Sequence, residues 1–75
     1  MFILQKVVNM RLKNSVAEYR KKTGLTQEEL AKRVGVSRQT IISIEKGNYF
    51  PSLLLGFRLA DTLRVSLEAL FSLEL

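Results

Sequence analysis

The sequence contains no cysteine and no histidine among its 75 residues. A disulfide framework is therefore excluded, and so is a zinc site of the usual cysteine and histidine kind. No histidine is present to act as the base of a Ser/His/Asp or Cys/His set. The carboxylates lie in helical patterns beside basic residues, which is typical of a solvated or paired surface. We expect no metal, no cofactor and no catalytic site, so the chain is not predicted to be an enzyme.

Long apolar runs are also missing, and proline occurs only once. No stretch approaches the 18 or more apolar residues that a membrane-spanning helix needs. The opening MFILQKVV is too short for the core of a signal peptide followed by a cleavage site. A chain of this length permits one domain with one small core, which oligomerisation often completes. We therefore expect a cytoplasmic protein with no membrane contact and no evident small-molecule ligand.

Acidic residues are scarcer than basic ones, and the charges are unevenly distributed. The net charge is +5, with a net +6 in residues 1–51 and a net −1 in residues 52–75. A basic surplus favours an anionic partner such as a nucleic acid. The alternative is that the lysines and arginines merely keep a surface soluble. Either way, the basic part of the chain and its C-terminal part are predicted to have different roles.

The stretch from Thr26 to Glu45 carries the strongest pattern. It reads TQEELAKRVGVSRQTIISIE and predicts two short helices, at about 27–34 and 38–46. Thr26 with Glu29 forms a capping box, in which each side chain binds a backbone N–H of the first turn. Gly35 ends the first helix because glycine adopts a positive φ at little cost, and a serine caps the second. Two helices joined by such a turn are the signature of a helix-turn-helix, whose second helix enters the DNA major groove.

A helix is predicted before this unit. Either Asn14 or Ser15 opens this helix; Ser15 with Glu18 forms a second capping box, and Gly24 ends the helix. Arg20 lies on the apolar stripe of this helix, and an unpaired buried charge is costly. Arg20 therefore needs an acidic partner, and Glu45 is the predicted one.

Two more helices follow the unit. Ser52 caps a strongly apolar helix over about 53–63, and Ser66 caps a short one over about 67–71. Arg64 stands where a glycine is expected at a helix end. It requires either a non-glycine residue in the left-handed region or a looser turn.

The two ends of the chain give weaker signals. Residues 1–9 are apolar and β-prone, and they precede a possible second start at Met10. One interpretation is an arm that pairs with the body of the domain or with a second subunit. The alternative is an extension with no role. Residues 71–75 alternate apolar and polar side chains, which indicates a short strand.

The chain resembles the Xre-like family of phage-repressor-type (Cro/cI-type) helix-turn-helix domains over about residues 12–71. The motifs that carry the resemblance are Arg20, GLTQEELA at 24–31, GVSRQTIISIEKG at 35–47, PSL at 51–53 and VSLEALF at 65–71. The resemblance implies an all-α, five-helix domain over residues 10–75 with a C-terminal dimerisation region. Some family members add short strands, which here would be about 10–13 and 71–75. It also implies that Arg20 and Glu45 form a structural ion pair.

Four side chains of the second helix of the unit point away from its buried stripe: Arg38, Gln39, Ile42 and Ser43. Residues near the start of such a helix reach the floor of the major groove. Arginine can bind guanine and glutamine can bind adenine through two hydrogen bonds each, and isoleucine can contact a thymine methyl group. The resemblance likewise implies that Arg38, Gln39 and Ser43 face base edges. The alternative is an ordinary exposed helix surface.

A second set is predicted to contact phosphates. The Gln27 amide can donate to a phosphate beside the first N–H groups of its helix. The resemblance adds Thr26 at the same helix start, Thr40 near a phosphate or a thymine methyl group, and a loop at the opposite phosphate wall that consists of Lys46, Gly47 and Asn48. The alternative for each is an ordinary solvated position.

The last third of the chain has more apolar residues than a small core needs. The predicted dimer interface consists of Leu54, Phe57, Leu67, Leu70, Phe71 and Leu73. One domain reads only a few base pairs, and a twofold dimer would place two recognition helices roughly 34–36 Å apart. The alternative is that these residues close the core of a monomer.

These observations together predict a sequence-specific regulator of transcription that binds double-stranded DNA. The expected form is a repressor that binds a palindromic operator as a homodimer. The alternative function is a protein-interaction module, such as an antitoxin or a transcription bridging factor.

Overall fold

A computed structural model describes residues 11–74, which form five helices and two short strands. In chain order they are β1 (Arg11–Asn14), α2 (Val16–Thr23), α3 (Gln27–Val34), α4 (Arg38–Glu45), α5 (Leu53–Leu63), α6 (Leu67–Leu70) and β2 (Phe71–Glu74). The predicted five-helix fold is confirmed. The helix ends differ from the prediction at α4, which ends one residue earlier, and at α6, because Phe71 is already extended (φ −130°, ψ 134°). The predicted arm at residues 1–9 lies outside the described residues.

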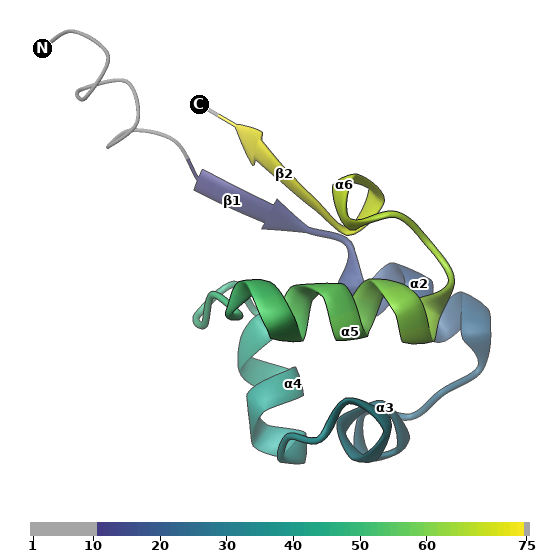
Figure 1. Ribbon diagram of the computed structural model, residues 1–75. Coiled ribbons are helices and arrows are strands. Elements are labelled where there is room, and N and C mark those ends of the chain that lie inside the picture. Colours follow the sequence, from purple (N-terminus) through teal and green to yellow (C-terminus); the bar gives the residue numbers. More distant parts are fainter. Residues whose placement is uncertain (1–10, 75) are drawn as a thin grey trace, which may run out of the picture.

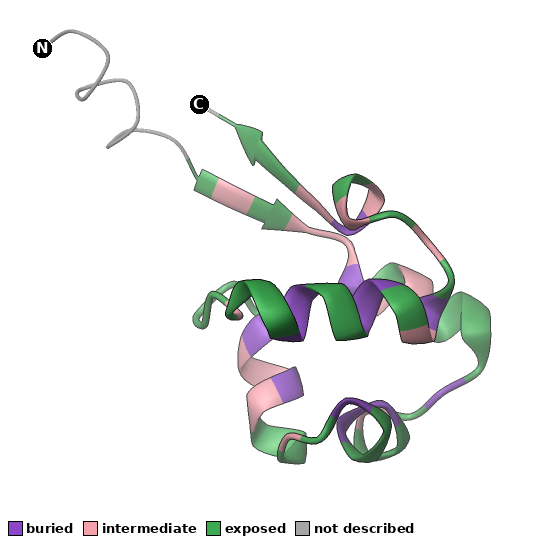
Figure 2. Ribbon diagram, in the orientation of Figure 1, coloured by how far each residue is buried: buried purple, intermediate pink, exposed green. Residues whose placement is uncertain are grey.

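Helix α5 crosses the middle of the molecule, with α3 and α4 on one side and the strands on the other (Figure 1). Buried residues occur on all five helices and form one core cluster, whereas the strands hold only exposed and half-buried residues (Figure 2). The most completely buried side chains include Leu30, Ile41 and Leu59, one from each of α3, α4 and α5. Each such side chain contributes about 1.5–3 kcal/mol by leaving water. This core fixes the angle between α3 and α4.

The two strands join the ends of the described chain in one antiparallel pair. Arg11 lies opposite Glu74, and Asn14 lies opposite Phe71. The two predicted terminal strands are therefore present. A two-stranded sheet is weak by itself, and here the backbone N–H of Ser15 donates to the carbonyl of Leu70 at 2.8 Å where the sheet meets the helices.

Side-chain caps start four of the five helices, as predicted. The hydroxyl oxygens of Thr26, Ser37, Ser52 and Ser66 each accept a hydrogen bond from the backbone N–H three residues further on. The predicted capping box at Ser15 is wrong, because the Ser15 side chain makes no capping hydrogen bond. Asn14 caps this helix instead, and its Oδ1 accepts from the Val16 N–H at 3.2 Å. Glu18 pairs with Lys22.

The end of α5 settles the two alternatives for Arg64. Its backbone is left-handed, with φ 59° and ψ 43°. The N–H of Arg64 donates to the carbonyl of Asp61, and the N–H of Val65 donates to that of Ala60. These bonds satisfy carbonyl groups that a helix end otherwise leaves free. Arg64 therefore takes the place that glycine usually occupies.

Candidate nucleic-acid interface

Helices α3 and α4 form a rigid pair joined by a tight turn. Gly35 has φ 79°, and the N–H groups of Gly35 and Val36 both donate to the carbonyl of Ala31. The inner faces of the two helices pack into the core through fully buried side chains such as Leu30 and Ile41. Burial of these inner faces leaves the outer face of α4 free for a partner.

The first turn of α4 presents the longest polar side chains of this outer face. Arg38 and Gln39 are exposed, whereas Thr40, Ile42 and Ser43 are half-buried. Within residues 11–74, no hydrogen bond engages the side chains of Arg38 or Gln39. The Thr40 hydroxyl shares a 3.0 Å hydrogen bond with Ser37. Arg38 and Gln39 therefore have their full hydrogen-bonding capacity for a ligand.

The start of α3 lies beside this face. The predicted capping box is present: the Glu29 N–H donates to Thr26 Oγ1 at 3.0 Å, and the Thr26 N–H donates to Glu29 Oε1 at 2.9 Å. The pKa of Glu29 is lowered, chiefly by the hydrogen bond from the Thr26 backbone. The bond with the Thr26 side chain and the nearby basic residues add smaller contributions. An open polar hollow of about 520 Å³ reaches from here to α4, lined by Arg20, Thr26, Gln27, Glu28 and Arg38. Two guanidinium groups thus flank a space beside a helix start, where anions are favoured.

The predicted ion pair between Arg20 and Glu45 is present. Arg20 Nε lies 2.7 Å from Glu45 Oε2, and the two side chains are only 12% and 8% exposed. The structure adds a contact that the sequence did not predict, since Gln27 Nε2 donates to Glu45 Oε1 at 3.0 Å. The start of α3 is thereby attached to the end of α4.

The turn after α4 is exposed along its whole length. Lys46, Gly47 and Asn48 all lie at the surface, and Gly47 has φ 81°. The Asn48 N–H donates to the carbonyl of Ser43 at 2.9 Å, which holds the turn against the end of α4. The predicted base-contacting residues, the start of α3 and this turn therefore all belong to, or directly adjoin, the α3–α4 pair.

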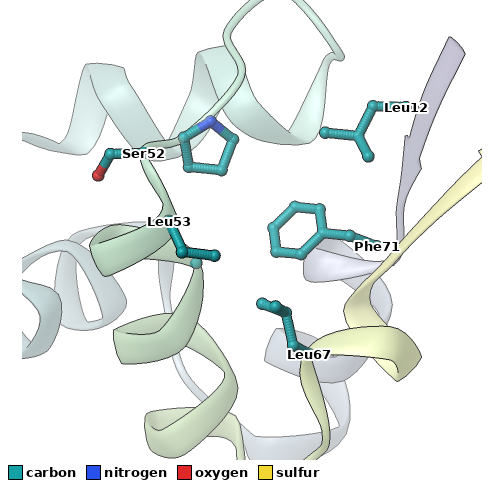
Figure 3. Close-up of a pocket in the computed structure, with 7 residues that line it drawn as sticks. Leu12, Ser52, Leu53, Leu67 and Phe71 are labelled. Carbon is teal, nitrogen blue, oxygen red and sulfur yellow. The ribbon is translucent and has the colours of Figure 1, made fainter. Parts of the chain in front are cut away.

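Most of the predicted dimer residues lie at the surface, in a different region. Leu54, Phe57 and Leu73 are 61%, 54% and 65% exposed. Leu67 and Phe71 are half-buried and face an apolar groove (Figure 3). Leu70 is a correction: it is 1% exposed and belongs to the core of the single chain. The four-residue helix α6 packs one side against the core, and Leu70 lies on that side.

The sequence reasoning missed part of this apolar surface. Phe50 and Leu53 are 66% and 68% exposed, and Tyr49 is exposed as well. The groove has a volume of about 160 Å³ and is lined by Leu12, Pro51, Ser52, Leu53, Gly56, Leu67 and Phe71. Leu12, Leu53, Leu67 and Phe71 surround it from β1, α5, α6 and β2 (Figure 3). The dense run of apolar residues from Tyr49 to Phe57 was the available signal, because a single helix cannot bury such a run on one side.

Asn14, one of the two residues predicted to open α2, also makes a long-range contact that was not predicted. Its Nδ2 donates to the carbonyl of Ile44 at 2.9 Å, across 30 positions of the chain. This bond satisfies a carbonyl group in the last turn of α4. Nothing in the local sequence indicates a partner so far away.

Two further findings concern the described residues alone. Residues 11–74 hold no group of three acidic side chains that could bind a metal ion. None of the helices in that range combines the length and hydropathy that crossing a bilayer requires.

The fold and this surface define a helix-turn-helix DNA-binding domain, and comparison with known proteins supports that class. The helix-turn-helix family matches residues 16–70. An uncharacterized HTH-type transcriptional regulator of Methanothermobacter thermautotrophicus is 55% identical over 64 residues, which cover 84% of this chain and 93% of that protein. Another, of Methanocaldococcus jannaschii, is 54% identical over 63 residues, covering 84% and 96%.

A solved structure agrees with the same fold. The restriction-modification controller protein C.AhdI from Aeromonas hydrophila superimposes with a TM-score of 0.68 at 31% identity, covering 72% of this chain and 82% of that chain. The chain belongs to the helix-turn-helix family, in its Xre-like, Cro/cI-type branch. This is a class of DNA-binding transcriptional regulators and not of enzymes.

Proposed function

We propose that the protein is a sequence-specific repressor that binds a palindromic operator in double-stranded DNA as a homodimer. The observation that carries the proposal is the free outer face of α4. This face begins with the exposed Arg38 and Gln39 and is flanked by the start of α3 and by the turn after α4. A helix so flanked fits the major groove with a phosphate contact on either side.

Base recognition is assigned to the outer face of α4. Arg38 suits guanine and Gln39 suits adenine, because each side chain can make two hydrogen bonds to one base edge. Ile42 and Ser43 lie one turn further on, where a methyl contact and a single hydrogen bond fit. The half-burial of these two side chains restricts their motion, which lowers the entropy lost on binding.

Phosphate contacts are assigned to both flanks. Thr26 and Gln27 would hold one strand at the start of α3, and Lys46, Gly47 and Asn48 would hold the other. Thr40, which follows Gln39 on α4, is assigned to a nearby phosphate. Thr26 donates its backbone N–H within its own capping box, so its hydroxyl group is the donor left for a phosphate. Such contacts fix the register of the helix without reading sequence.

The dimer is assigned to the apolar surface of Leu54, Phe57, Leu67, Phe71 and Leu73. Leu54, Phe57 and Leu73 are more than half exposed, and exposed apolar side chains of this size favour burial against a partner. The part of the chain from residue 52 onward is nearly neutral, so two copies can meet there without bringing their strongly basic parts together. A dimer that occupies both halves of a palindrome excludes other proteins from that DNA, which is the basis for proposing repression.

Two alanine substitutions separate the assigned roles. Gln39→Ala should cost about 1–3 kcal/mol on the specific site and much less on random DNA, because it removes base recognition. Gln27→Ala should weaken both complexes by the same factor, because the DNA contact that it removes is to a phosphate and not to a base. The measurement is titration of labelled duplexes at several salt concentrations. Equal losses on specific and random DNA for Gln39→Ala would contradict the base-reading assignment.

A further inference from the structure

The carboxylate of Glu45 gathers hydrogen-bond donors from two other helices. Arg20 of α2 donates through Nε to Oε2 at 2.7 Å and through Nη2 to Oε1 at 3.2 Å. Gln27 of α3 donates through Nε2 to Oε1 at 3.0 Å. Glu45 is itself the last residue of α4. One carboxylate therefore joins all three helices at the edge of the proposed interface.

We propose that Glu45 is a positioning residue for DNA binding, which holds the Gln27 amide in the orientation that donates to a phosphate. The inference rests on the proposed function, in which Gln27 contacts the DNA backbone. It goes beyond the role of Glu45 as a structural ion-pair partner, because it gives the carboxylate an effect on affinity through Gln27.

The chemistry of the contact decides which way the amide faces. An ionised carboxylate only accepts hydrogen bonds, so it can bind the NH₂ end of the Gln27 amide and not its oxygen. One N–H is used in this bond, and the second remains to donate to a phosphate oxygen. A freely rotating amide would also present its oxygen to the phosphate, where two acceptors repel each other. Glu45 thus favours the orientation of the Gln27 amide in which the NH₂ group is available to the phosphate.

The anchor itself is fixed before DNA arrives. The Glu45 side chain is 8% exposed, and its partner Arg20 also donates through Nη1 to the carbonyl of Leu25 at 3.0 Å. Leu25 is buried and directly precedes Thr26, the residue that caps α3. Because Gln27 is held by a carboxylate that is buried and bonded to Arg20, it loses less rotamer freedom on binding than a free side chain would, which favours affinity.

Long-range electrostatics predicts the opposite effect of Glu45. A negative charge near the interface repels DNA, so its removal alone should tighten binding. The substitution Glu45→Gln should therefore weaken DNA binding if Glu45 positions Gln27, and should tighten it if Glu45 only repels DNA. The glutamine keeps one acceptor oxygen and replaces the other with an NH₂ group, which sets a donor against either Arg20 Nε or Gln27 Nε2.

The test is a double-mutant cycle measured on a random duplex, which reports phosphate contacts without base recognition. We expect Glu45→Gln to weaken binding about 3- to 10-fold, the range of one hydrogen bond lost from an interface. On the Gln27→Ala background the same substitution should change the affinity by less than about twofold, because the group it positions is gone. Glu45→Asp, which keeps the charge but withdraws the oxygens, should weaken binding in the same way if Glu45→Gln does not fold.

Glu18→Gln is the matched control. Glu18 is also paired with a basic residue, but both side chains are more than half exposed and lie on α2. This variant removes the same charge and should bind DNA as the wild type does, or slightly more tightly. Circular dichroism should confirm that each variant is folded at the assay temperature. In the wild type, the side-chain amide signals of Gln27 should show a hydrogen bond by NMR that Glu45→Gln removes.

Three outcomes distinguish a failure of the positioning role of Glu45 from a failure of the proposed DNA-binding function. Additive effects of Glu45→Gln and Gln27→Ala, with normal binding by the wild type, would overturn the positioning role and leave the proposed function intact. Tighter binding by Glu45→Gln would also overturn it, in favour of simple charge repulsion. A wild-type protein that binds no duplex at any salt concentration would contradict the proposed function itself.

Discussion

Arg64 is the single non-glycine residue in residues 11–74 whose φ is positive. A side chain at this position crowds the following carbonyl group, which costs roughly 1–2 kcal/mol. The strain is tolerated because the two hydrogen bonds that close α5 require this conformation. The side chain of Arg64 is exposed, so it contributes no core packing that would offset the strain.

Arg64→Gly should therefore raise the free energy of unfolding. We expect a gain of about 0.5–1 kcal/mol, since the strain relieved exceeds the extra freedom of glycine in the unfolded chain. Thermal unfolding followed by circular dichroism measures it, with a rise of roughly 2–8 °C in Tm. Arg64→Ala is the control, because it keeps the Cβ and should give no gain. Equal stabilities of the glycine and alanine variants would show that α5 ends without backbone strain.

Glu29 provides a second test, in its response to pH. Its pKa lies below the ordinary value, first because of the hydrogen bond from the Thr26 backbone and then because of the bond with the Thr26 side chain. A carboxyl group whose pKa is lowered by folding stabilises the fold above its unfolded pKa. That stability is lost as the pH falls through the folded pKa.

Thr26→Ala should raise the pKa of Glu29 toward its ordinary value, because it removes the side-chain half of the capping box. Thr26→Ser keeps the hydroxyl group and should leave the pKa low. An NMR titration of the Glu29 side chain in the three proteins measures the effect. If the pKa were the same in the alanine variant, the Thr26 side chain would make no contribution, and the bond from the Thr26 backbone, which the variant keeps, would account for the lowered pKa.

At the scale of helices and strands, the sequence determines most of the boundaries because the signals are local. Helix α3 begins after Thr26 and ends before Gly35, as predicted, since a cap and a left-handed glycine each depend on a few neighbouring residues. Helix α5 follows from Ser52 and an apolar pattern in the same way. The ion pair of Arg20 and Glu45 was also predictable, because a charge on a buried stripe demands a partner.

The errors arise where distant parts of the chain meet. The side chain of Ser15 makes no capping bond; instead Asn14, the last residue of β1, accepts from the Val16 N–H and donates to the carbonyl of Ile44 in α4. Leu70 was assigned to the dimer interface, with the monomer core as the alternative, and the packing of α6 against the body buries it in the core. The bond from Gln27 to Glu45 spans 18 positions and depends on how α3 crosses α4. No local pattern carries such information.

At the scale of the whole molecule, the two proposed surfaces lie on different parts of the chain. The proposed DNA-binding surface belongs to the basic part, whereas most of the exposed apolar residues lie between Tyr49 and Phe57 and in β2. The two surfaces lie on different elements, so one can bind DNA while the other binds a second copy. We therefore expect dimer formation and folding to respond to different substitutions.

Phe57→Ser tests this separation. Phe57 is more than half exposed and should contribute to the dimer rather than to the core, so the variant should fold but dissociate to a monomer. Sedimentation equilibrium at micromolar concentration gives the mass, and circular dichroism gives the stability. Arg58→Ser, at the adjacent exposed position of α5, is the control and should remain dimeric. A wild-type protein that is monomeric in this assay would contradict the dimer.

The most direct test of the central claim is in vitro selection of DNA bound by the wild-type protein. Two recognition helices related by a twofold axis should select an inverted repeat, whose half-sites lie about 10–10.5 base pairs apart or a multiple of that spacing. Each half-site should contain guanine and adenine positions that fit Arg38 and Gln39. Enrichment of such a repeat is the predicted result. A bound pool with no enriched sequence, or with a single half-site that never repeats, would contradict the account.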